Sequence, residues 1–210
     1  MRKIICALVI AGLSLALSAC NNNERRVKIK DGAAVIADVG IKVTLPKGWV
    51  VFDTEESMNR DSTMIWEFSG NYADYAKFDA DVRPWGSRFM LYAERPGGGI
   101  ALILWGGEPR EAMDVYDFAR DLNNTVTELY KQGGYDVHGS LEPIPNSEST
   151  GISGYISEVN IKESERDTER IRVLSDYIFT YKGDMYCMEI CAEESAYDDG
   201  KNIQILPAEL

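Results

Sequence analysis

The chain has 210 residues, of which 34 are acidic and 22 are lysine or arginine, so its formal net charge at pH 7 is −12. This balance argues against nucleic acid as a partner, because phosphate recognition needs lysine and arginine gathered on one face. The length suits a single domain with its own hydrophobic core, and four cysteines are too few to indicate a disulfide framework.

The first part of the chain has the pattern of a secretory signal. Two basic residues precede an apolar run over residues 4–16, and the small residues Ser18 and Ala19 follow it. The run is shorter than the roughly 20 apolar residues that a membrane-spanning helix needs. We therefore expect residues 1–19 to be a signal peptide that is removed during export.

Cys20 follows directly, at the end of the tetrapeptide Leu17-Ser18-Ala19-Cys20. This tetrapeptide resembles the lipobox of bacterial lipoproteins, in which a diacylglycerol is attached to the cysteine sulfur and the chain is cut just before it. The resemblance implies lipid attachment at Cys20 and a mature chain of 191 residues with a net charge of −14. Two or three acyl chains hold a protein durably on a membrane, since each buried methylene adds about 0.8 kcal/mol. The alternative is an ordinary secretory signal, which Leu17 disfavours because a small residue is usual there.

A polar tether is expected next, over residues 20–33, beginning with three asparagines. From residue 34 the pattern becomes strand-like, with short runs of β-branched, aromatic or aliphatic residues. We expect strands at residues 41–45, 49–52, 63–68, 88–93 and 100–105. The sequence Arg95-Pro96-Gly97-Gly98-Gly99 is predicted to be a hairpin turn between the last two.

One long amphipathic helix is predicted over residues 115–132. Asp114 is placed to cap its first turn, and the pair Gly133-Gly134 allows a left-handed exit. A single apolar stripe at spacings of three and four is formed by Val115, Phe118, Ala119, Leu122, Val126, Leu129 and Tyr130.

Further strands are expected after this helix, at residues 135–141, 155–161, 170–181 and 185–191, with a tight hairpin at Lys182-Gly183-Asp184. Strands with local connections on both sides of one long helix predict an α+β fold with a largely antiparallel sheet flanked by helices. The C-terminal segment 193–210 contains Gly200 and Pro207 and has only a weak apolar pattern, which leaves its order open.

The segment Gly40-Ile41-Lys42-Val43-Thr44-Leu45-Pro46-Lys47-Gly48-Trp49, together with the single helix and the long late strands, resembles the PsbP-like domains of many bacterial lipoproteins. The resemblance covers residues 34–192. It implies a PsbP-like α/β/α sandwich, and a domain that binds or assists another protein rather than performing chemistry. The chain departs from the family pattern at its C-terminal segment and over residues 72–85, which are longer and more aromatic than a strand connection requires.

Four aromatic residues are the candidates for recognition: Tyr72, Tyr75, Phe78 and Trp85. They alternate with charged residues, a composition that is common at protein interfaces. Packing in the core is the competing interpretation.

No catalytic or metal-binding set emerges from the sequence, and no cofactor is expected. If Cys187 and Cys191 lie on one strand, their α-carbons are about 13 Å apart, too far for a disulfide. His138 is the only histidine, and its neighbours suggest a strand. We therefore expect a lipid-anchored protein on the extracytoplasmic side of the cell membrane, with a non-enzymatic domain acting on an envelope or surface protein. The alternative is an envelope hydrolase.

Overall fold

The computed structural model of the chain describes residues 27–30, 32–52, 88–109, 114–145, 147–165 and 168–208. Its elements, in chain order, are β1 (Val27–Lys30), β2 (Ala33–Ile36), β3 (Ile41–Thr44), β4 (Val50–Phe52), β5 (Arg88–Arg95), β6 (Ile100–Pro109), α4 (Val115–Gln132), β7 (Asp136–Pro143), α5 (Ser147–Thr150), β8 (Ser153–Glu165), β9 (Thr168–Tyr181), β10 (Asp184–Glu193), α6 (Glu194–Gly200) and β11 (Gln204–Pro207).

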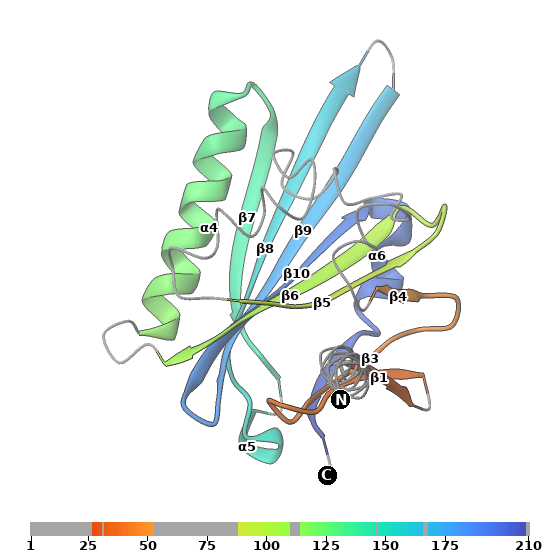
Figure 1. The fold of residues 1–210 in the computed structure, drawn as a ribbon. Helices are drawn as coiled ribbons and strands as arrows, with labels where there is room; N and C mark the ends of the chain where they lie inside the picture. Colours follow the sequence, from red (N-terminus) through yellow and green to blue (C-terminus); the bar gives the residue numbers. More distant parts are fainter. Residues whose placement is uncertain are drawn as a thin grey trace, which may run out of the picture.

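These strands form two antiparallel sheets (Figure 1). The larger sheet has seven strands in the order β4-β5-β6-β10-β9-β8-β7, and the smaller has four in the order β1-β2-β3-β11. The predicted α+β class with a largely antiparallel sheet is therefore confirmed. The predicted strand at residues 63–68 lies outside the described residues.

Short turns join two pairs of neighbouring strands in the larger sheet, β9 to β10 and β5 to β6. Lys182 and Gly183 both have positive φ angles, 53° and 91°, which suits a two-residue hairpin between β9 and β10. The connection from β5 to β6 is closed by a hydrogen bond from the Gly98 amide to the Arg95 carbonyl, 2.8 Å long. Both predicted hairpins are confirmed.

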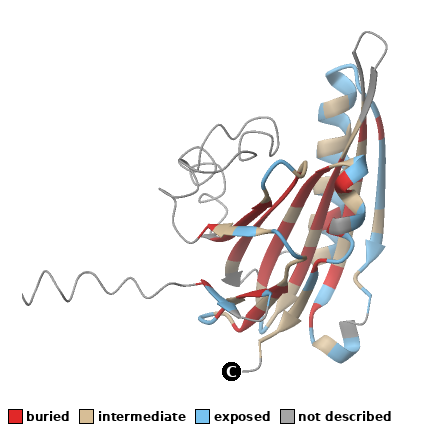
Figure 2. Cartoon of the chain, turned by 90° about the vertical axis from the view of Figure 1, so that its right-hand side faces the viewer, coloured by how far each residue is buried: buried red, intermediate tan, exposed pale blue. Residues whose placement is uncertain are grey.

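The two faces of the seven-stranded sheet bury different sets of side chains, because alternate residues of a strand point to opposite sides. On β10, Cys187 and Cys191 belong to the core cluster that also contains Ala119 of α4. Met188 and Ile190 belong to a second cluster on the other face, which includes residues of the small sheet and of α6. Figure 2 shows the buried residues concentrated along the central strands.

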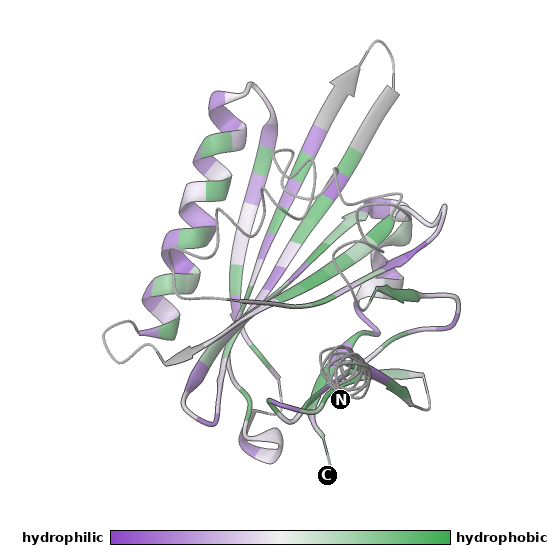
Figure 3. Cartoon of the chain, viewed as in Figure 1, coloured by the Kyte–Doolittle hydropathy of each residue, from purple (hydrophilic) through white to green (hydrophobic). Residues whose placement is uncertain are grey.

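Helix α4 has the predicted bounds. The Asp114 carboxylate accepts hydrogen bonds from the backbone amides of Tyr116 and Asp117, so this residue caps the helix as expected. The apolar stripe packs on the sheet and alternates with polar positions, as the green and purple bands of Figure 3 show. Leu129 is the exception, because its side chain is 57% exposed. Near the C-terminal end the sheet covers the side that holds Val126 and Tyr130, and leaves Leu129 outside.

The small sheet is built from both ends of the described chain. Residues 27–30, which we assigned to the tether, form β1 and pair with β2. The C-terminal segment, whose order the sequence left open, forms α6 and β11, and β11 pairs with β3. The start and the end of the described chain consequently lie on the same side of the molecule (Figure 1). No helix in the described ranges is long and apolar enough to cross a membrane.

Candidate functional site

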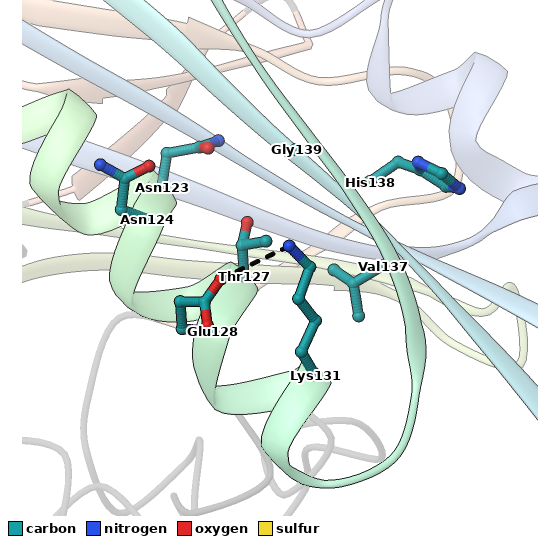
Figure 4. A pocket seen from close by; sticks show the side chains of 8 residues that line it. All are labelled: Asn123, Asn124, Thr127, Glu128, Lys131, Val137, His138 and Gly139. Atoms are coloured by element: carbon teal, nitrogen blue, oxygen red, sulfur yellow. Dashed lines mark hydrogen bonds and ion pairs between the residues drawn. The ribbon is translucent and has the colours of Figure 1, made fainter.

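An open groove runs between α4 and β7, at the edge of the larger sheet (Figure 4). It has a volume of about 320 Å³. Polar side chains dominate its lining, which consists of Asn123, Asn124, Thr127, Glu128, Lys131, Val137, His138 and Gly139.

Gly139 lies where two side chains of the helix come close to the strand. A β-carbon at this position would lie 2.7 Å from both the Asn123 Oδ1 and the Thr127 Oγ1 atoms. Such a contact is closer than van der Waals packing allows, so with any larger residue either these two side chains or the helix that carries them would have to shift. A glycine inside a strand often marks this kind of close approach.

Asn123 joins the helix to two strands at the inner wall of the groove. Its side-chain amide donates to the Ser140 carbonyl at 2.9 Å and to the Ser157 hydroxyl at 3.0 Å. Ser157 is fully buried, so this bond satisfies a hydroxyl that water cannot reach. The inner wall is thus fixed by hydrogen bonds between α4, β7 and β8.

The outer rim of the groove is exposed and carries charge. Lys131 and Glu128 form an ion pair of 3.4 Å on the helix surface, which is worth little by itself. The Thr127 hydroxyl is buried and has no hydrogen-bond partner among the described residues. The groove therefore presents a cation and a carboxylate to whatever enters it, above the buried Thr127 hydroxyl and the apolar side chain of Val137.

A second polar feature lies inside the sheet, on the face toward α4. Asp176 on β9 stands directly opposite Glu189 on β10 and, on its other side, opposite Ser157 on β8. Burial raises the pKa of Asp176 well above its usual range, and the neighbouring Glu189 raises it further. Burial also raises the pKa of Glu189 to about 7. The pair therefore retains a proton near neutral pH, as two close carboxyl groups in a poorly solvated site do.

A third polar cluster lies on the opposite face and fixes α6. The Tyr197 hydroxyl donates to one oxygen of Glu158 at 2.5 Å, and the Asn160 amide donates to the other at 3.0 Å. Burial raises the pKa of Tyr197, and its hydrogen bond to Glu158 raises it further. This cluster joins the C-terminal segment to the middle of β8.

Within the described part of the chain, the two cysteines and the histidine considered in the sequence analysis are not brought together. Cys187 and Cys191 are buried and form no disulfide, as predicted. Burial raises the pKa of the Cys187 thiol, with further contributions from Asp176 and Glu189, so the reactive thiolate is disfavoured. His138 lies on β7, as expected, and is 81% exposed. Its strand position is opposite Asn160, which places it on the face away from Cys187.

The structure does not test two predictions from the sequence, the lipid site and the aromatic recognition residues. Cys20 and the four aromatic candidates, Tyr72, Tyr75, Phe78 and Trp85, lie outside the described residues. Among the residues that the structure does describe, no three His, Cys, Asp or Glu side chains group as a metal ion would require.

Comparisons with known proteins show no family for this chain. No family profile and no curated protein matches the sequence. Among solved structures, the chain is similar to cyanobacterial PsbP (CyanoP) from Synechocystis sp. PCC 6803, with 12% sequence identity and a TM-score of 0.43. The similarity covers 87% of this chain and 89% of that chain. At these values the likeness transfers no site residue and no activity.

Proposed function

We propose that this chain is a lipoprotein held on the extracytoplasmic side of the cell membrane by lipid on Cys20. We further propose that its folded domain is a non-enzymatic module that binds another envelope or surface protein. The sequence Leu17-Ser18-Ala19-Cys20 supports the anchor. The groove between α4 and β7 supports the binding role.

The groove favours a peptide segment of a partner over a small apolar ligand. Its walls are polar and open, whereas pockets for small organic ligands are mostly apolar and enclosed. β7 is also the outermost strand of the described sheet, and a partner segment can add to such a strand through backbone hydrogen bonds. Asn124, Glu128 and Lys131 are then positioned to contact the side chains of that segment.

Site-specific cross-linking in living cells tests this proposal. A photoreactive residue at position 124 is expected to capture a protein partner, because this position lines the groove. The matched control is position 201, which follows α6 and whose side chain is 60% exposed. Capture of the same proteins in equal yield from both positions, or from neither, would contradict a binding role for the groove.

The aromatic residues Tyr72, Tyr75, Phe78 and Trp85 remain a proposed second contact surface, supported by their interface-like composition. Replacing Tyr75 and Trp85 by alanine separates the two interpretations. Loss of partner capture with an unchanged melting temperature is expected for an interface. A large fall in melting temperature would instead assign these side chains to the core.

A further inference from the structure

Positive charge is concentrated in the part of the chain nearest the lipid site. Residues 25–47 contain six lysines and arginines and two acidic residues, a net charge of +4. Residues 48–210 contain fourteen basic and thirty-one acidic residues, a net charge of −17. The charge of the mature chain is therefore strongly asymmetric, which is a recognised sign of surface association.

The structure places two of these lysines in one row across the outer face of the small sheet, with Val35 between them. Lys28 on β1 is opposite Val35 on β2, and Val35 is opposite Lys42 on β3. The alternate positions Ile36 and Ile41 are buried in the second core cluster, so the row that contains the lysines points away from the core. Lys28 is exposed, and Lys42 and Val35 are partly exposed.

The length of chain before β1 keeps this face close to the anchor. Lys28 lies eight positions after Cys20, and a fully extended chain over that distance spans at most about 28 Å. Charges near a membrane act over about 8 to 10 Å at physiological ionic strength. A short tether therefore holds the two lysines where they encounter the headgroups frequently.

We propose that the outer face of the small sheet, through Lys28 and Lys42, rests on anionic phospholipid headgroups. This inference rests on the proposed lipid anchor. Basic residues beside a lipid anchor add an electrostatic contribution to membrane binding, and a lipid plus a basic surface is a common pair of signals. The strongly acidic remainder is repelled by the same headgroups, so both signs of charge favour one orientation.

This orientation would also determine where the α4–β7 groove lies relative to the membrane surface. In Figure 1 the small sheet lies at the lower right, together with the start and end of the described chain, whereas α4 and β7 lie on the left. Seating the small sheet on lipid therefore leaves the α4–β7 groove accessible from the aqueous side, where a partner protein would approach.

Chemical labelling of lysines tests the proposal within one molecule. The mature chain is coupled through the Cys20 sulfur to a maleimide lipid in vesicles of phosphatidylcholine, with or without phosphatidylglycerol. Exposed lysines are acetylated, and the rate of acetylation of each lysine is measured by mass spectrometry. We expect phosphatidylglycerol to slow labelling of Lys28 and Lys42 at least about threefold. Lys131 and Lys201 serve as internal controls and should be unaffected, and high salt should restore labelling.

Charge reversal provides a second readout. In Lys28→Glu, the protection of Lys42 should be lost, whereas Lys201→Glu should leave it intact. Equal labelling of Lys28 and Lys42 on both kinds of vesicle, or equal protection of all four lysines, would overturn the proposal. The synthetic coupling makes this result independent of natural acylation, which intact-mass measurement of the native protein reports separately.

Discussion

Asp176 and Glu189 face each other directly across β9 and β10, on the side of the sheet that faces α4. Burial raises the pKa of both groups, that of Glu189 to about 7. The folded chain therefore binds a proton here more tightly than the unfolded chain does. The stabilising contribution is complete below the unfolded pKa, near pH 4, and is lost as the pH rises through about 7.

The first prediction concerns Glu189→Gln, which removes the titrating charge and keeps the shape. Relative to the wild type, this variant should gain about 1 to 3 kcal/mol of unfolding free energy between pH 5 and pH 8, because it no longer loses a proton. Urea unfolding at several pH values measures the effect. Glu148→Gln, at an exposed position, is the control, and its unfolding free energy should vary with pH as that of the wild type does. The prediction is refuted if the unfolding free energy of Glu189→Gln also varies with pH as that of the wild type does.

The second prediction concerns Gly139→Ala. The added β-carbon would lie 2.7 Å from the Asn123 and Thr127 side-chain oxygens, so these side chains or α4 must shift. We expect a loss of about 1 to 3 kcal/mol of unfolding free energy. The neighbouring change His138→Ala alters a side chain that is 81% exposed and should stay within about 0.5 kcal/mol of the wild type. An unchanged midpoint for Gly139→Ala would show that the helix has room to shift freely.

The third prediction concerns Tyr197→Phe, which deletes the hydroxyl that donates to Glu158. The lost hydrogen bond to a partly buried carboxylate should cost about 1 to 2 kcal/mol, and hydrogen exchange in α6 should speed up. Tyr116→Phe is the control, because that ring is 43% exposed on α4. Equal exchange in α6 for the two variants would mean that the hydroxyl does not hold the helix in place.

The fourth prediction concerns the proposed anchor. In cells, Cys20→Ala should remove the added lipid mass and abolish release of the chain at residue 20, whereas Cys6→Ala should change neither, because Cys6 lies within the predicted signal peptide. Intact-mass analysis of the detergent-extracted protein reads both outcomes. A wild-type chain with an unmodified Cys20 would end the lipoprotein proposal and leave the described fold untouched.

Features with a local signal were predictable from the sequence. The spacing of apolar residues predicted a helix over 115–132, and α4 has these bounds. The hairpin at Lys182 and Gly183 was also predictable from local sequence, because two residues with positive φ suffice to form such a turn. These elements depend on neighbours within a few positions along the chain.

Pairings between distant segments were not predictable. β11 pairs with β3, so that Gln204 stands opposite Thr44, 160 positions away. Both strands have four residues, and neither specifies its partner. The weak apolar pattern of the C-terminal segment has its explanation here, since Ile203 is buried in the second core cluster and Ile205 packs against it.

The candidate groove was missed because each of its walls is ordinary in isolation. Asn124, Lys131 and His138 are exposed polar residues of the kind that cover most protein surfaces. Gly139 was the available signal, since a glycine within a predicted strand indicates that another part of the chain comes close. The sequence did not reveal that this part is α4.

The position of β1 also determines how the molecule responds to mechanical load. Tension on the chain that precedes Val27 acts on the open end of the β1–β2 hairpin, where Val27 is opposite Ile36. When the hairpin is pulled from its open end, the hydrogen bonds between β1 and β2 break one after another. This takes less force than breaking all of them at once by sliding the two strands past each other. Four unzipped residues would add about 13 Å of reach. The seven-stranded sheet lies outside the pairing that such tension would open first.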